Sequence, residues 1–272
     1  MNSELVKQTL RALRHKNYRL FFTGQSLSLI GTWMQSVALG WLVYRMTDSA
    51  FLLGLVGFSS QIPTFILASI AGVLADRYNK HKILIITQTL AMVQAFILAF
   101  LTLSSSIQIW HIILLSLFSG LINAFDMPTR QSFVIDMVDD RNDLPNAIAL
   151  NSSVFNAARL IGPTIAGFLI AALGEGFCFL INALSFLTVI AALLMMKIPP
   201  KEKNHKNEKV LEGVKEGIKY AYNFKPIRAL LLLIGLVSLT GMPYTVLMPV
   251  FAKDILHGNS QTLGFLFGAV GT

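Results

Sequence analysis

Long apolar runs alternate with short polar segments along most of the 272 residues. A helix needs about 20 mostly apolar residues to cross a bilayer, so each long run predicts one membrane-spanning helix. The fourth and fifth runs are the least regular, because Asp126 ends one and Arg159 interrupts the other. The seven predicted spans cover roughly residues 18–44, 51–75, 83–103, 109–125, 147–173, 177–196 and 228–251.

The pattern of apolar runs continues to the end of the sequence. The seventh run contains Gly241 and Pro243, where we expect a break in the helix. An eighth run begins near Thr262 and stops at Thr272, after about 15 Å of helix, which is roughly half the membrane. We therefore expect the chain to be part of a longer protein.

The runs predict an all-α polytopic membrane protein with a two-lobed plan. Residues 18–197 would form a six-span N-terminal lobe, and residues 228–272 would begin a second bundle. Residues 1–17 and the cytoplasmic linker 198–227 each show apolar residues at helical spacing, which predicts amphipathic helices on the membrane surface. These apolar residues are Leu5, Val6, Leu10 and Leu13 before the first span, and Val210, Leu211, Val214, Ile218 and Tyr222 in the linker.

Charge and composition support a membrane protein over a nucleic-acid-binding one. Only 13% of the residues are charged, against about a quarter in soluble domains. Nineteen of the 22 lysines and arginines fall in segments that share one side if the spans alternate, which explains the net charge of +8. Basic loops stay in the cytoplasm, so the N-terminus is predicted to be cytoplasmic, in a cell membrane.

Metal and disulfide chemistry are not predicted. The single cysteine, Cys178, cannot form a disulfide framework and is expected to be a small core or lipid-facing residue. The five histidines are scattered without the spacing of metal ligands. No cofactor and no metal site are therefore expected.

The turn after the second span carries a tight cluster of charges. Residues 72–82 read Gly-Val-Leu-Ala-Asp-Arg-Tyr-Asn-Lys-His-Lys, with one carboxylate and three basic side chains between two apolar runs. This stretch resembles the second–third loop signature of the major facilitator superfamily. Residues 126–131, 143–152 and 155–159 are similar to the branch of that superfamily that contains enterobactin, macrolide and multidrug exporters.

The resemblance implies a conformational latch on the cytoplasmic side. Asp76 would accept hydrogen bonds from a helix N-terminus of the second lobe, where the dipole favours an anion, and would stabilise the outward-open state. Asn79 replaces a glycine of the signature, so we expect it to take the left-handed conformation that asparagine tolerates. The alternative is a plain positive-inside turn. The latch residues would be Gly72, Asp76, Arg77, Lys80, Asp126 and Arg130, with Asp126 placed to meet Arg77 or Lys80.

The fifth span carries a stripe of small residues. Ala158, Gly162, Pro163 and Gly167 resemble the antiporter signature of the superfamily, with Ala158 and Ala166 in two glycine places. Small residues four apart let helix backbones approach closely. The resemblance implies a packing motif associated with exporters, and the alternative is generic small-residue packing.

Polar residues at helical spacing predict a water-facing substrate cavity. They lie in the first, fourth and fifth spans, whereas the third and sixth spans are poorer in such stripes and are expected to be peripheral. Polar groups in a membrane face a cavity or one another, so helix–helix hydrogen bonding is the alternative. The candidate cavity residues are Gln25, Ser28, Gln35, Asn123, Asn156 and Arg159.

The coupling ion stays open. Many proton-coupled members have an arginine four residues before a glycine of the fourth span, but Ser116 stands four residues before Gly120. The first span holds no carboxylate. A proton remains a candidate, because the rest of a second lobe could supply the titrating group.

The sequence also permits two alternatives to a transporter. Asp139, Asp140 and Asp143 match the DDxxD pattern with which membrane prenyltransferases hold Mg²⁺, but a second aspartate motif is missing. Asp143 fits better as a helix N-cap before Leu144 and Pro145. The other alternative is a non-transporting remnant. We predict a non-enzymatic exporter of a small amphipathic molecule that works by alternating access, with the substrate unidentified.

Overall fold

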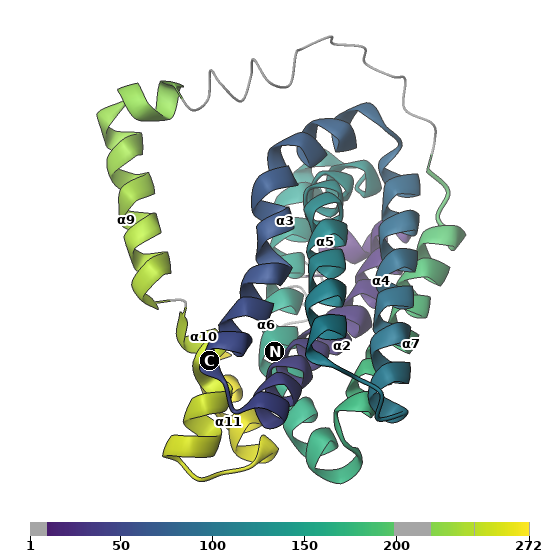
Figure 1. Ribbon diagram of the computed structural model, residues 1–272. Coiled ribbons are helices and arrows are strands. Elements are labelled where there is room, and N and C mark those ends of the chain that lie inside the picture. Colours follow the sequence, from purple (N-terminus) through teal and green to yellow (C-terminus); the bar gives the residue numbers. More distant parts are fainter. Residues whose placement is uncertain (1–9, 199–218, 242, 272) are drawn as a thin grey trace, which may run out of the picture.

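The structure is a computed structural model that describes residues 10–198, 219–241 and 243–271. The described residues form helices joined by short connections (Figure 1). The first six long helices are α2 (Lys16–Thr47), α3 (Ala50–Arg77), α4 (Lys80–Leu103), α5 (Ile109–Met137), α6 (Leu144–Leu173) and α7 (Glu175–Met195). They are followed by α9 (Lys225–Gly241), α10 (Pro243–Val250), a π-helical turn η3 (Phe251–Ile255) and α11 (Ser260–Gly271).

Seven helices in the described part of the chain are long and apolar enough to cross a membrane, with α9, α10 and η3 counted as one. The predicted all-α class and the seven spans are therefore confirmed. The break expected between Gly241 and Pro243 coincides with residue 242, which lies outside the described residues, and stays a prediction. The irregularity that the structure does describe in this span is η3, near its other end.

Parts of the two predicted surface helices lie outside the described residues. These are Leu5 and Val6 before the first span, and Val210, Leu211, Val214 and Ile218 in the linker. Within the described residues, a 3-10 turn η1 (Arg11–Arg14) precedes α2, and Tyr222 is exposed in a short helical stretch before α9.

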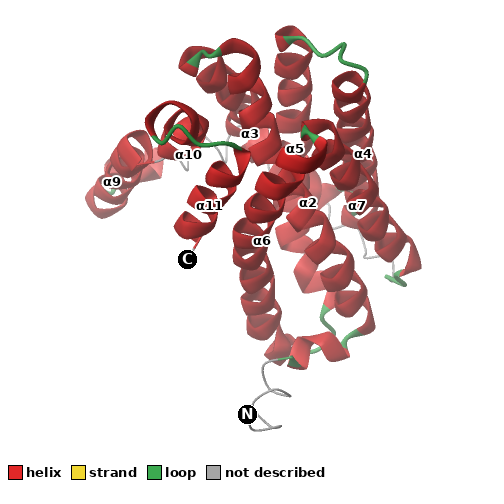
Figure 2. Ribbon diagram, turned by 90° about the horizontal axis from the view of Figure 1, so that it is seen from below, coloured by secondary structure: helices red, strands yellow, loops and turns green. Residues whose placement is uncertain are grey.

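The six helices pack into one bundle in which α2 contacts both α6 and α7. Helix α3 packs on α5, and α4 packs on α5 and α7. Helix α11 lies beside α6 (Figure 2), while α9 stands apart and has no buried residue. Cys178 is fully buried in a core cluster with Leu42, Val43 and Phe179, so it is a core residue.

The fourth span is longer than its apolar run predicted. Helix α5 continues through Asp126 and Pro128 to Met137, although the apolar run ends at residue 125. The helix can continue because the Asp126 carboxylate is buried with partners: Thr87 and Gln88 of α4 donate hydrogen bonds to it. A charged side chain therefore does not mark the end of this span.

The turn between α3 and α4 uses Asn79 differently from the prediction. Its φ is −68° and its ψ is 106°, which is extended rather than left-handed backbone. The Asn79 side chain caps α4 by accepting a hydrogen bond from the backbone N–H of Lys82 at 3.1 Å. Asparagine is among the best N-cap residues, so its role here is to start a helix.

Candidate functional site

Small residues in α6 bring its backbone close to two neighbours. A Cβ atom on Gly162 would lie 2.7 Å from the Cβ of Trp33 in α2. A Cβ atom on Gly167 would lie 2.7 Å from the carbonyl oxygen of Ser260 in α11. Neither position has room for a larger residue without movement of a helix, so the close packing expected of the motif is present on two sides of α6.

Both α6 and α11 contribute a glycine to the close contact between them. A Cβ atom on Gly264 would lie 2.9 Å from the carbonyl oxygen of Pro163, and the buried hydroxyl of Ser260 donates a hydrogen bond to the carbonyl of Gly167 at 3.1 Å. Ala158 and Ala166, which occupy glycine places of the signature, are also buried. Close backbone approach through small residues is a common way to join membrane helices. The link of this motif to export stays a prediction.

The polar residues of α2 do not share one environment. Gln25 and Ser28 are buried. Gln35 donates a hydrogen bond to the Gln94 side chain of α4 at 3.2 Å and accepts one from the Asn182 amide of α7 at 2.8 Å. Gln35 therefore faces α4 and α7, and helix–helix hydrogen bonding, the alternative considered for these residues, describes it.

The third and sixth spans, predicted to be poorer in polar stripes, still supply single amides to contacts inside the bundle. Gln94 of α4 is buried and also donates to the Leu115 carbonyl of α5 at 3.3 Å, and Asn182 of α7 is buried. An amide inside an apolar run is costly without a partner, and this signal could have identified both residues from the sequence.

The polar residues of α5 and α6 are more accessible. Asn123 and Asn156 are exposed, and the Asn156 amide donates a hydrogen bond to the Ser152 carbonyl of its own helix at 2.9 Å. Arg159 is half-buried and has no ion-pair or hydrogen-bond partner among the described residues. All three side chains are at least partly accessible to a ligand or to another part of the protein.

Asp126 forms a compact buried cluster instead of meeting Lys80. Its Oδ1 atom accepts hydrogen bonds from Thr87 at 2.8 Å and Gln88 at 2.7 Å, and its Oδ2 atom contacts the guanidinium of Arg130. Lys80 lies instead 3.5 Å from the carboxylate of Asp136, near the end of α5. Two of the predicted latch residues, Asp126 and Arg130, thus pair with each other within α5. A third, Lys80 of α4, pairs with Asp136 of α5, which was not among the predicted residues.

The remaining latch residues lie at the end of α3. Gly72 has no neighbour within 4 Å of a Cβ atom built on it, and Arg77 is an exposed residue in the last turn. Asp76 lies on the same helix turn, and its side chain is outside what the structure describes. Its latch role therefore stays a prediction.

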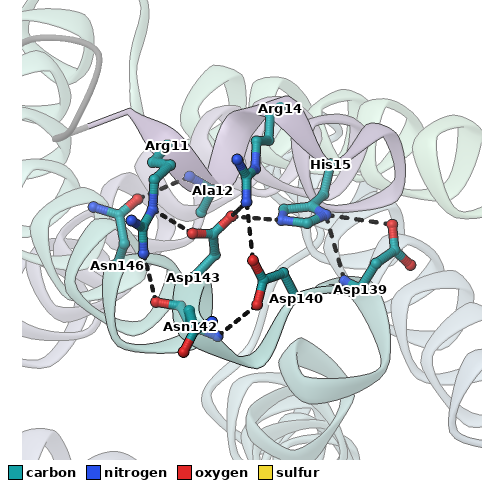
Figure 3. A network of polar contacts seen from close by, with 9 residues as sticks. All are labelled: Arg11, Ala12, Arg14, His15, Asp139, Asp140, Asn142, Asp143 and Asn146. Atoms are coloured by element: carbon teal, nitrogen blue, oxygen red, sulfur yellow. Dashed lines mark hydrogen bonds and ion pairs between the residues drawn. The ribbon is translucent and has the colours of Figure 1, made fainter. Parts of the chain in front are cut away.

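A charged cluster that sequence analysis missed joins the chain before α2 to the start of α6 (Figure 3). The fully buried carboxylate of Asp143 contacts Arg11 and lies 2.7 Å from Arg14 Nη2 and 2.8 Å from His15 Nε2. Asp143 stands at the predicted N-cap position of α6, but its side chain makes no capping hydrogen bond. The positions of these basic residues in the sequence predict only the membrane topology, and nothing in the sequence indicates which loop they contact.

The DDxxD alternative does not describe this cluster. Asp139 lies 3.3 Å from His15 Nδ1, and Asp140 lies 3.2 Å from Arg14, so each carboxylate of the pattern has a basic partner from the N-terminal segment. Among the residues that the structure describes, no three side chains of His, Cys, Asp or Glu are arranged to hold a metal ion.

Polar contacts also join the helices at the ends that lie away from the Asp143 cluster. Arg45 at the end of α2 makes two hydrogen bonds, of 2.8 and 3.1 Å, with the buried carboxylate of Glu175 at the start of α7. Lys253 of η3 contacts Asp48, and the Tyr44 hydroxyl donates to Asp254. These two polar contacts thus hold the π-helical turn η3 against the end of α2.

The profile of the family described as transmembrane secretion effector matches residues 7–272. The chain is 29% identical to a staphyloferrin A transporter of Staphylococcus aureus over 90% of its own length and 62% of that protein. It is 25% identical to an enterobactin exporter of Shigella boydii (99% of this chain, 64% of that protein).

A third relative is macrolide efflux protein A of Streptococcus pyogenes, with 21% identity over 90% of this chain and 62% of that protein. The chain therefore spans less than two thirds of the length of these relatives. All three are named as transporters or efflux proteins, which favours a transporter over the enzyme alternative.

Proposed function

The chain belongs to the transmembrane secretion effector family of the major facilitator superfamily, and we propose that it exports a small amphipathic molecule by alternating access. The names of the relatives support this direction, because they include an enterobactin exporter and a macrolide efflux protein. In this proposal, residues 18–197 are the first lobe, residues 198–227 are the linker, and residues 228–272 begin the second lobe.

The observation that carries the proposal is the position of Arg159 on α6. The helix packs closely on α2 through Gly162 and on α11 through Gly167, so it lies between the first lobe and the start of the second. A charged residue without a partner among the described residues, in the middle of such a helix, marks a substrate or ion pathway by default. Asn156 of the same helix, Asn123 of α5 and Gln25 of α2 would extend this pathway.

The orientation and the latch complete the proposal. Positive-inside charge supports a cytoplasmic N-terminus in the cell membrane. Asp76, at the end of α3, would bind a helix N-terminus of the second lobe in the outward-open state. The pair Lys80–Asp136 supports this role, since it joins α4 to α5 beside that turn. The coupling ion in this proposal is a proton, and the side chain that binds the proton would come from the second lobe.

The test is uptake into inside-out membrane vesicles that carry the full chain. We expect accumulation of at least one of staphyloferrin A, enterobactin or a radiolabelled macrolide above vesicles without the protein. Asp76→Asn should abolish this uptake while the protein still inserts, because it removes the charge and keeps the size. The matched control is Lys82→Gln, which removes an exposed charge from the same turn. Lack of uptake of all three compounds by the parent would overturn the proposal.

A further inference from the structure

We propose that Arg159, with the aromatic pair Trp33 and Phe155, binds organic anions that carry a flat apolar ring. This inference deepens the proposed function, since it names the class of molecule that would occupy the pathway beside α6. It rests on the depth of Arg159, on the absence of a partner for it among the described residues, and on the Phe155 ring one helical turn before it, which packs on Trp33.

Arg159 lies near the middle of its helix. Helix α6 has 30 residues from Leu144 to Leu173, which places Arg159 about 22 Å from its first residue at 1.5 Å per residue. A guanidinium at the centre of a membrane span is expensive unless water or an anion compensates it. The position therefore calls for a partner.

The side of α6 that bears Arg159 faces protein and not lipid. At about 100° per residue, Arg159 lies between Gly162, which contacts α2, and Gly167, which contacts α11. The exposed apolar residues Ile161 and Ile165 lie on roughly the opposite side of the helix. Arg159 thus points toward the space that α2, α6 and α11 border.

No described carboxylate is available to neutralise Arg159. Each carboxylate whose side chain the structure describes is engaged by a residue other than Arg159. These engaged carboxylates are Asp48, Asp126, Asp136, Asp139, Asp140, Asp143, Glu175 and Asp254. A bound anion would supply the missing charge, and a guanidinium fork matches a carboxylate through two parallel hydrogen bonds.

The aromatic pair lies next to this charge. Phe155 precedes Arg159 by four residues on the same face of α6. Its ring packs edge-to-face on Trp33, with 5.7 Å between the ring centroids and an angle of 71°. Gly162, one turn after Arg159, lets α2 approach closely enough to hold Trp33 there. Phe155 remains 44% exposed, so its ring surface is available to a second flat group.

The site selects by charge and by shape together. A cation would be repelled by Arg159, and a neutral molecule would leave the guanidinium uncompensated. An aliphatic anion would satisfy Arg159 but make less use of the two rings. An anion with an attached aromatic or conjugated ring is the ligand that uses both features.

Trp33 itself provides the assay. The chain has three tryptophans, so replacing Trp41 and Trp110 by phenylalanine leaves Trp33 as the sole indole of the purified full chain. The probes are para-bromobenzoate, para-bromobenzyl alcohol and para-bromobenzylammonium, which share one quenching ring and differ in charge. We expect saturable quenching by the benzoate and at least about tenfold weaker binding of the other two probes.

Variants then locate the charge that is recognised. Arg159→Gln should weaken benzoate binding about tenfold or more, because it removes hydrogen bonds to a charged group. Arg19→Gln, which removes an exposed arginine near the start of α2, should leave binding within about twofold. Phe155→Leu should weaken binding of the benzoate but not of cyclohexanecarboxylate, measured by competition.

Equal quenching by the three probes in the parent protein would overturn the inference without any variant at position 159. Benzoate binding that is unchanged in a folded Arg159→Gln protein would also overturn it. Both outcomes are independent of vesicle uptake: export without charge selectivity rejects this inference alone, and selective binding without export rejects the proposed function alone.

Discussion

Replacing Gly162 by alanine is the most direct test of the close packing around α6. The added Cβ would lie 2.7 Å from the Trp33 Cβ and 2.8 Å from the carbonyl oxygen of Ile30. Neither atom is the end of a flexible side chain, so α2 and α6 must move apart. Overpacking of this kind costs about 1–3 kcal/mol, while alanine in a helix gains about 0.5–1 kcal/mol over glycine.

The helix gain set against the overpacking cost leaves a net loss between roughly 0 and 2.5 kcal/mol, centred on about 1 kcal/mol. For a protein of this size a loss of about 1 kcal/mol lowers the melting temperature by roughly 2–4 °C. The measurement is thermal unfolding of the purified protein in detergent, followed by tryptophan fluorescence.

A matched substitution separates packing from helix propensity. Gly54 in α3 has no atom within 4 Å of a Cβ built on it, so Gly54→Ala should leave the melting temperature unchanged or raise it by a few degrees, roughly the 0.5–1 kcal/mol of helix propensity. If Gly162→Ala were as stable as Gly54→Ala, the α2–α6 contact would not be as tight as described, and the reasoning would fail.

Three further predictions follow from the topology, the buried cluster and the unpaired arginine. A single cysteine at Ser105, on a background lacking Cys178, should be labelled from outside the cell and one at Asp139 should not; the reverse result would invert the topology. Asp143→Asn should lower the melting temperature more than Asp140→Asn, since Asp143 is fully buried and has three basic neighbours; equal effects would argue against the cluster. Arg159→Lys should reduce vesicle uptake of anionic compounds more than of neutral ones, because lysine lacks the planar fork; equal reduction would remove charge recognition from the role of Arg159.

The helical class and the number of spans could be predicted from the sequence alone. The length of an apolar run is a local property, and the bilayer thickness converts it directly into a helix. The small residues of α6 could also be identified from the sequence, because only small side chains at that spacing let two backbones meet. Which helices would meet there, α2 at Gly162 and α11 at Gly167, could not be predicted.

The partners of the polar and charged side chains, in contrast, depend on how the chain folds in three dimensions. Gln35 meets Gln94 and Asn182, and Asp143 meets Arg14, across separations of many tens of residues. Such pairs depend on how helices are arranged around one another, which no local pattern encodes. The same reason explains α5: a carboxylate ends a span or is buried within it according to whether neighbouring helices provide hydrogen-bond donors, as Thr87 and Gln88 do for Asp126.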